Sequence, residues 1–196
     1  MKRRDTLAGL CLAPWWLAGC ASDAPPARWY ELRAEPPQPK PTPRPGDGAV
    51  WEVASVVRLP GALDRDTLVV ASGAAMVVPL AGHRWAEPLR ESIPSRLVAD
   101  LALLRGEGLV WRAPVQSGVA VDKRLRVQID ALIADADHRS LHMKARWWLS
   151  DERASKAAPA MGEADFQVPL ADNSVDALAA GHRMAIWQLA QRIVAS

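Results

Sequence analysis

The sequence has little cysteine: two residues in 196, Cys11 and Cys20. Cys11 lies in an amino-terminal segment that we expect to be removed, and Cys20 is the expected attachment site of a lipid, for the reasons given below. No thiol then remains for a disulfide, so the mature chain must be stabilised by its hydrophobic core. The 177 residues that follow residue 19 are enough for one such core in a single domain.

The chain also lacks an excess of charge of either sign. It has 24 basic and 22 acidic residues, and its first 19 residues hold three of the basic residues and one of the acidic residues. The rest of the chain therefore has 21 of each. A balanced charge gives no basis for predicting a nucleic-acid partner or an attraction to anionic lipid.

The amino-terminal apolar stretch is too short to span a membrane. It runs for eleven residues from Leu7 to Leu17, whereas a spanning helix needs about 20. It follows the basic residues Lys2, Arg3 and Arg4, and the segment 1–19 as a whole is typical of a signal peptide. Arg3 and Arg4 also partly match a twin-arginine export signal, but we favour the general secretory route.

The expected signal peptide ends in a lipobox, Leu17-Ala18-Gly19-Cys20. Small residues let a peptidase reach the backbone, and the thiol of Cys20 can become a thioether to diacylglycerol. We predict cleavage before Cys20, a lipidated tether over residues 20–27 and anchoring by the attached acyl chains. The alternative is an ordinary signal peptide with a chance cysteine. Ala21 stands where an aspartate commonly retains lipoproteins in the inner membrane, which predicts a lipid-anchored, periplasm-facing protein of the outer membrane.

Catalytic motifs are missing from the sequence. It contains no Gly-x-Ser-x-Gly elbow, phosphate-binding glycine loop, Rossmann fingerprint or His-Glu-x-x-His helix. Asp130, Asp135 and Asp137 share one segment, but no base or nucleophile can be named beside them. We therefore predict no enzyme activity and no cofactor other than the covalent lipid.

The histidines do not predict a metal site. His138 and His142 have the spacing of a metal-binding pair on a helix, but they lie in a predicted turn and strand, where four residues span about 13 Å. His182 lies on the apolar stripe of the last predicted helix. We interpret it as a hydrogen-bonded, half-buried histidine.

The middle of the chain predicts strands followed by a helix. An early strand at 28–32 precedes a proline-rich segment, 36–46, which is either a docking ligand or an inert surface loop. Short valine-rich segments predict strands at 50–59, 67–71 and 76–80. An apolar repeat of four residues from Trp85 to Leu101 predicts an amphipathic helix. Pro88 suits its first turn, whereas Pro94 predicts a kink or a late start.

The clearest pattern is an alternation of apolar and polar residues over 124–133 and 141–150, which predicts a hairpin of two half-buried strands. The expected inward side of the first strand includes Ala131 and Ile133. Trp147 and Trp148 must point to opposite faces of the second strand. Trp148 is therefore either an exposed contact anchor or is covered by another element.

A last helix completes the predicted fold. Asn173 or Ser174 is expected to cap it, and its apolar stripe runs from Val175 to Ile193. Together the elements predict an α+β fold: a single domain over residues 28–196, with a largely antiparallel sheet and two main helices packed on one face.

Four segments, in order, resemble a known family. The most informative of them is Val57-Arg58-Leu59-Pro60-Gly61-Ala62-Leu63-Asp64-Arg65. Its proline, leucine, aspartate and arginine are spaced similarly to those of the ABC-type transport auxiliary lipoproteins, the PqiC-like family. The other three are residues 29–32, 84–89 and 145–147. Ala71-Ser72, where the family often has an arginine, and Pro94 depart from the pattern.

The resemblance implies a function without catalysis. It implies a component of an intermembrane lipid transport system, with an MCE-domain protein and its associated membrane transporter as partners. The candidate partner-binding residues are Pro60, Leu63, Asp64, Arg65 and Trp148. We expect residues 60–65 to form a turn in which Leu63 packs inward, and the alternative is that Asp64 only caps this turn.

Two further functional interpretations remain open. MCE proteins of the implied partner type form symmetric rings, which favours a homo-oligomeric ring or collar of this domain. In the other interpretation the protein carries lipid itself, which requires a continuous apolar cavity of several hundred Å3.

Overall fold

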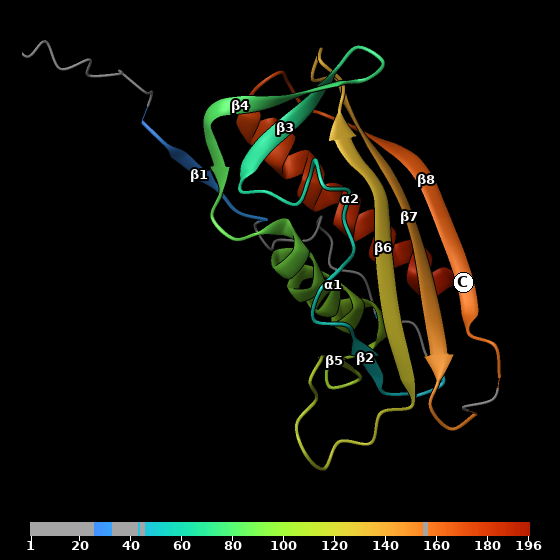
Figure 1. Cartoon of the computed structure of the whole chain (residues 1–196). Coiled ribbons are helices and arrows are strands. Elements are labelled where there is room, and N and C mark those ends of the chain that lie inside the picture. The colour runs from blue at the N-terminus through green and yellow to red at the C-terminus, as the bar shows by residue number, and fades with distance from the viewer. Residues whose placement is uncertain (1–25, 33–42, 44–45, 155–156) are drawn as a thin grey trace, which may run out of the picture.

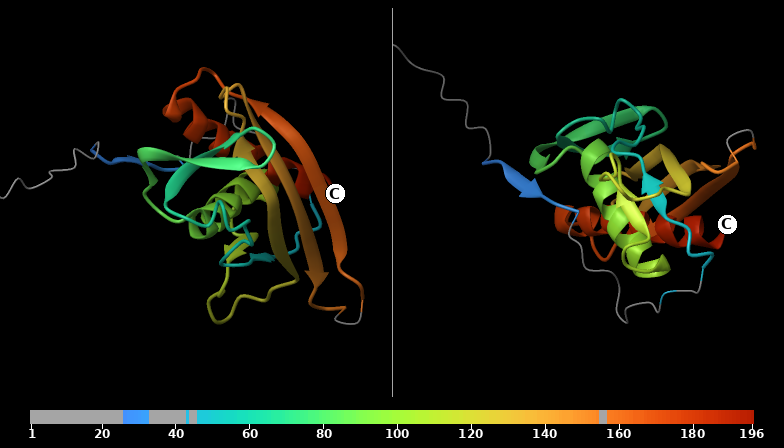
Figure 2. Two further views of the ribbon diagram at one scale, coloured as in Figure 1. Left: turned by 45° about the horizontal axis from the view of Figure 1, so that its top comes forward. Right: turned by 90° about the horizontal axis from the view of Figure 1, so that it is seen from below.

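The computed structural model describes residues 26–32, 43, 46–154 and 157–196. Cys20, Ala21 and most of the proline-rich segment 36–46 lie outside these residues. The described chain forms one α+β domain, in which two helices cover one face of a mixed sheet (Figure 1, Figure 2). The predicted fold class is confirmed, and the predicted strand directions need a correction.

Three long strands form one side of the sheet: β6 (Lys123–Ala134), β7 (Ser140–Asp151) and β8 (Ala160–Pro169), each antiparallel to the next, with β8 at the edge. Two branches pair with the other edge of β6. One holds β2 (Trp51–Val53) and β5 (Val110–Arg112), and the other holds β3 (Thr67–Ser72), β4 (Met76–Trp85) and β1 (Arg28–Tyr30).

The sheet is mixed because the two branches contain parallel pairs. These are β1 with β4, β2 with β5, β2 with β6, and β3 with β6. A tight turn joins only antiparallel neighbours, and the chain enters each of these positions through a longer crossover. The prediction of a largely antiparallel sheet rested on the hairpins and did not include these crossovers.

The β6–β7 hairpin is confirmed, but the predicted inward side of β6 is wrong beyond its middle. Asp130 forms a β-bulge, at which the register against β7 shifts by one residue. After the bulge Leu132 and Ala134 are buried, in place of the predicted Ala131 and Ile133.

The first helix, α1 (Leu89–Arg105), begins later than the apolar repeat predicts. Trp85 is the last residue of β4, and Pro88 is the residue before the helix rather than part of its first turn. Pro94 lies inside α1, and the helix continues through it.

The second helix, α2 (Val175–Ala195), begins as predicted at Ser174, whose hydroxyl accepts a hydrogen bond of 3.1 Å from the amide of Ala177. Strands β5 and β8 were not predicted. The strand predicted over residues 50–59 is limited to β2, and beyond it Arg58 makes an isolated bridge to Gln128.

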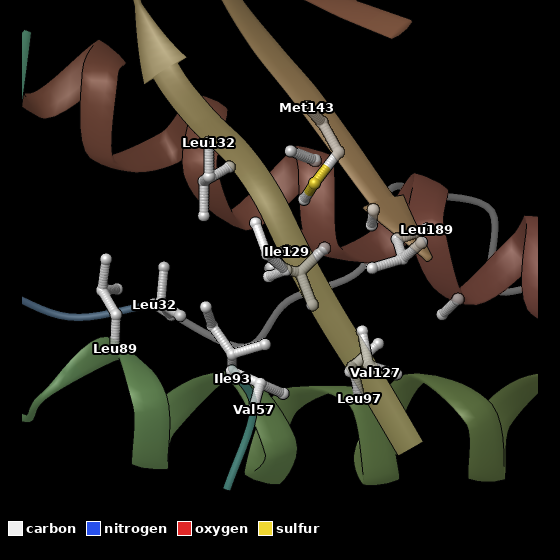
Figure 3. Packing of buried hydrophobic residues seen from close by; sticks show 14 of the residues in the cluster. Leu32, Val57, Leu89, Ile93, Leu97, Val127, Ile129, Leu132, Met143 and Leu189 are labelled. Atoms are coloured by element: carbon white, nitrogen blue, oxygen red, sulfur yellow. The ribbon is translucent and has the colours of Figure 1, made fainter. Parts of the chain in front are cut away.

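The core lies between the two helices and the sheet. Side chains from α1, β6 and α2 converge there, and the most deeply placed are at most 1% exposed (Figure 3): Ile93, Leu97, Ile129, Leu132 and Leu189. These closely spaced large side chains stabilise the domain and fix the positions of the loops at the start of α1.

Candidate functional site

The predicted turn at residues 60–65 is present and is fixed from below by Leu63. The amides of Leu63 and Asp64 both donate to the carbonyl oxygen of Pro60, at 2.8 and 3.2 Å. The side chain of Leu63 is buried in the core, with 4% exposed, so the predicted inward position is confirmed. This burial holds the turn in one place and leaves its charged residues at the surface.

The charged residues of the turn face α1 and β4. A guanidinium nitrogen of Arg90 lies 3.4 Å from a carboxylate oxygen of Asp64, and both side chains are about half exposed. Asp66 forms an ion pair with Arg84, and the Arg84 guanidinium lowers the pKa of Asp66. Arg65 is exposed between these two pairs in the sequence. Arg65 is therefore exposed on a segment that is held on both sides by an ion pair.

A second connection joins this loop to the helix. The amide of Val57 donates a 3.2 Å hydrogen bond to the carbonyl oxygen of Arg90 in the first turn of α1. In a regular helix that carbonyl would accept from residue 94, but Pro94 has no amide hydrogen. The loop thus supplies the donor that the proline removes.

Strand β1 adds a third segment to the same place. The Tyr30 hydroxyl and Nδ1 of His83 on β4 are hydrogen-bonded at 2.8 Å, and the amide of Ala86 donates to the carbonyl oxygen of Tyr30 at 2.8 Å. The amide of Trp85 donates to the carbonyl oxygen of Asp66 at 2.6 Å. We call residues 28–32, 57–66 and 83–90 together the α1 junction. It unites three of the four segments that carry the family resemblance.

A surface groove of about 530 Å3 borders the α1 junction. Trp29, Glu31 and Ala86 line one side of it, and Asp176 and Met184 of α2 line the other. The groove is open to solvent and mixes charged with apolar residues. It therefore differs from the enclosed apolar cavity that a lipid carrier requires.

Trp148 lies apart from the turn. Trp147 is buried, and Trp148 is half-buried on the opposite face of β7, where its register neighbours are Arg126 on β6 and Met161 on β8. Met161 is 70% exposed. Since the turn contacts α1 and β4 instead, the predicted partner-binding residues form two separate surfaces.

A buried ion pair joins the two helices and was missed by the sequence reasoning. The guanidinium of Arg183 on α2 donates to both carboxylate oxygens of Asp100 on α1, at 2.6 and 2.8 Å, and both side chains are at least nine-tenths buried. Burial raises the pKa of Asp100, and the hydrogen bonds from Arg183 oppose that effect. Asp100 and Arg183 are single polar residues on two amphipathic helices, and neither helix alone indicates that its polar residue is buried against the other.

His182 has the predicted structural role and is more deeply buried than expected, with 3% exposed. Its Nδ1 donates to the carbonyl oxygen of Leu178 at 2.8 Å, and its ring meets the edge of Trp85 with centroids 5.1 Å apart. Burial lowers the pKa of His182 to about 4. The imidazole is therefore neutral at physiological pH.

The other histidines take part in surface hydrogen bonds. Nε2 of His142 donates to a carboxylate oxygen of Asp165 at 2.7 Å, and Nδ1 of His138 donates to the carbonyl oxygen of Asn173 at 3.1 Å. Within the described residues, no group of three or more histidine, cysteine or acidic side chains is placed to hold a metal ion.

The three neighbouring aspartates have separate partners. Arg146 donates to Asp130 at 2.8 and 3.1 Å and lowers its pKa. Asp135 accepts from the Ser140 hydroxyl, and Asp137 pairs with an arginine in the hairpin turn. Each carboxylate is explained by local structure.

In the part of the chain that the structure describes, neither helix has the length and apolar composition needed to cross a bilayer. Cys20 and Ala21, the predicted lipidation and sorting residues, lie outside that part.

Solved structures share this fold at low sequence identity. A crystal structure of an uncharacterized protein is 16% identical to this chain, covers 87% of it and 98% of its own length, and gives a TM-score of 0.68. A DUF330 protein from Xanthomonas campestris is 17% identical, with coverages of 86% and 93% and a TM-score of 0.68. No curated protein matches the sequence. These likenesses define the class of fold.

The sequence also matches a described family along most of its length. The family is that of the ABC-type transport auxiliary lipoprotein component, and the match runs over residues 30–194. The chain belongs to this family, which confirms the resemblance noted in the sequence.

Proposed function

We propose that this protein is a non-enzymatic adaptor of the outer membrane, lipid-anchored at Cys20 and sorted there by Ala21. Its domain faces the periplasm and receives the end of an MCE assembly in an ABC-type intermembrane lipid transport system. The proposal extends the family membership, which covers residues 30–194, to a particular place in the envelope and a particular partner.

The α1 junction carries the proposal, because it has the construction of a docking surface. Three separated segments are tied together by backbone hydrogen bonds around the start of one helix, and Leu63 anchors the turn in the core. A preorganised surface loses little conformational entropy on binding. The exposed Arg65 at its outer end, with the Asp64–Arg90 pair beside it, offers charge for selecting a partner.

The alternative is a carrier whose own cavity holds the lipid. The described core is filled by large aliphatic side chains, and the groove of about 530 Å3 is open and partly charged. Both features favour the adaptor. Further copies of the same chain are also proposed partners, because a homo-oligomeric ring of this domain would match the symmetry of an MCE ring.

The proposal is tested by crosslinking in cells. A photo-crosslinking residue replaces Arg65 in one strain and, as a matched control, the exposed Arg139 of the β6–β7 turn in another. We expect position 65 to capture an MCE-domain protein, identified by mass spectrometry, and position 139 to capture none.

A charge reversal completes the test. Arg65→Glu should abolish capture at a neighbouring crosslinking position while the purified domain keeps its circular dichroism spectrum. Unchanged capture by a correctly folded Arg65→Glu variant would remove the turn from the partner surface. Recovery of lipid bound within the purified domain would support the carrier instead.

A further inference from the structure

Trp29 is unusually exposed for a large aromatic residue. Its side chain is 60% exposed on β1, which pairs with only three residues of β4. Tryptophan is amphipathic, with an apolar ring system and one N–H group, and it is enriched where proteins meet the interface between membrane and water. An isolated exposed hydrophobic residue needs no explanation in general. Whether the exposure of Trp29 has a function therefore depends on where the residue lies relative to the proposed lipid anchor.

The position is set by the chain that precedes it. Trp29 is nine positions after Cys20, with eight residues between them. An extended chain advances at most about 3.5 Å per residue, so Trp29 lies within about 30 Å of a lipid on Cys20. The other large exposed hydrophobic side chains are much farther along the sequence: Val56, Met76, Val77, Val78 and Met161. Among the described residues, Trp29 is therefore the large exposed apolar side chain with the shortest chain connection to Cys20.

The surroundings of Trp29 fit the headgroup layer rather than the hydrocarbon. Its register partner on β4 is Arg84, whose guanidinium is paired with Asp66 and is still partly exposed, so its remaining N–H groups can meet lipid phosphates. Glu31 and Asp176 line the groove beside the indole. Carboxylates are costly to bury in hydrocarbon, so they limit the depth to which this face can enter.

We propose that Trp29 and the face of β1 around it dock onto the phospholipid surface to which the protein is anchored, with the indole at headgroup depth. The inference rests on the proposed lipidation of Cys20. Docking would convert a flexible attachment into an oriented one, because the bilayer then contacts the domain at two places: the acyl chains and the indole.

The test uses the lipidated mature protein in vesicles of phosphatidylethanolamine with a minority of phosphatidylglycerol. The acyl chains are brominated near the headgroup in one set and unbrominated in the other. Bromine quenches tryptophan emission only at short range. Trp29→Phe removes the indole whose emission would be quenched. Trp111→Phe is the matched control, since Trp111 lies on β5, at the other end of the strand order from β1 (Figure 1).

We expect the wild type and Trp111→Phe to be quenched by brominated vesicles, and Trp29→Phe to lose more than half of that quenching. The intact mass of each sample reports whether Cys20 carries lipid. A lipidated protein whose quenching does not depend on Trp29 overturns the inference and leaves the proposed anchoring intact. Emission of Trp29 that is blue-shifted but unquenched also overturns it, because a protein surface then covers the indole. An unlipidated mass overturns the anchoring as well.

Discussion

Val57 and Arg90 are joined by a backbone hydrogen bond of 3.2 Å that replaces the one Pro94 cannot make. A proline inside a helix ordinarily costs about 3 kcal/mol, partly because a carbonyl loses its donor. Here the donor comes from the loop that leads into the candidate docking turn. Helix α1 and the turn are therefore parts of one structural unit.

Pro94→Ala is expected to change the free energy of unfolding by no more than about 1 kcal/mol. The new amide competes for a carbonyl that is already satisfied, and the variant gains conformational freedom in the unfolded state. Urea denaturation followed by circular dichroism measures the change. A gain of about 3 kcal/mol would contradict the compensating role of Val57.

Asp100→Ala is expected to destabilise the domain by about 3–5 kcal/mol, because it leaves the guanidinium of Arg183 buried without a counter-ion. The paired variant Asp100→Leu with Arg183→Met should recover most of this loss, since apolar side chains of similar size replace both charges. Urea denaturation of the two variants provides the comparison. Equal destabilisation in both would mean that packing, rather than the unpaired charge, is responsible.

The stability of the domain should fall as the pH falls from about 6.5 to about 4. His182 is held neutral in the folded state, with a pKa of about 4 against 6.5 for a free histidine, so in this range the unfolded state binds a proton that the folded state does not. The full effect is about 3 kcal/mol. We expect His182→Gln to remove this part of the pH dependence and His138→Asn, in the hairpin turn, to keep it. Denaturation midpoints measured across this pH range give the difference.

Gly162→Ala is expected to destabilise the domain by about 1–3 kcal/mol through overpacking. The indole of Trp147 lies across Gly162 on the neighbouring strand, and an added Cβ would overlap the ring. Gly61→Ala is the control, because a Cβ at that position meets no atom within 4 Å. Thermal unfolding of both variants tests the contrast. Similar melting temperatures would show that the indole moves aside at little cost.

Cys20→Ser is expected to prevent lipidation and to release the protein from the membrane fraction, because a serine hydroxyl cannot form the thioether. Ala21→Asp should leave lipidation intact and shift the protein to inner membranes. Metabolic labelling with palmitate and density-gradient separation of the two membranes provide the measurements. A Cys20→Ser protein that is still processed and still sediments with membranes would exclude the lipid anchor.

Local patterns in the sequence predicted those features that depend on neighbouring residues. The hairpin of β6 and β7 follows from alternation, and the start of α2 follows from Ser174. The bulge at Asp130 was missed because its carboxylate is held by Arg146 on the next strand. β8 was missed because its inward side begins with Gly162 and Ala164, which are too small to give a hydrophobic signal.

The candidate site was predicted only in part, for the same reason. The turn at Leu63 has a local signature of proline, leucine and aspartate. Its connections do not, since Tyr30 and His83 are 53 residues apart and Asp100 and Arg183 are 83 apart. Nothing in either segment alone identifies its partner.

The three-residue pairing of β1 with β4 also determines how the domain responds to force. A pull on the chain ahead of Arg28 loads first the few hydrogen bonds of β1, and the long strands β6, β7 and β8 carry none of that load directly. Detachment of residues 28–31 would release up to about 14 Å of chain. Leu32, with 4% exposed, is the first residue that must leave the core for the extension to continue. The proposed anchor would thus be joined to the domain through a short extensible segment that ends at Leu32, so the distance between anchor and core could vary while the fold stays intact.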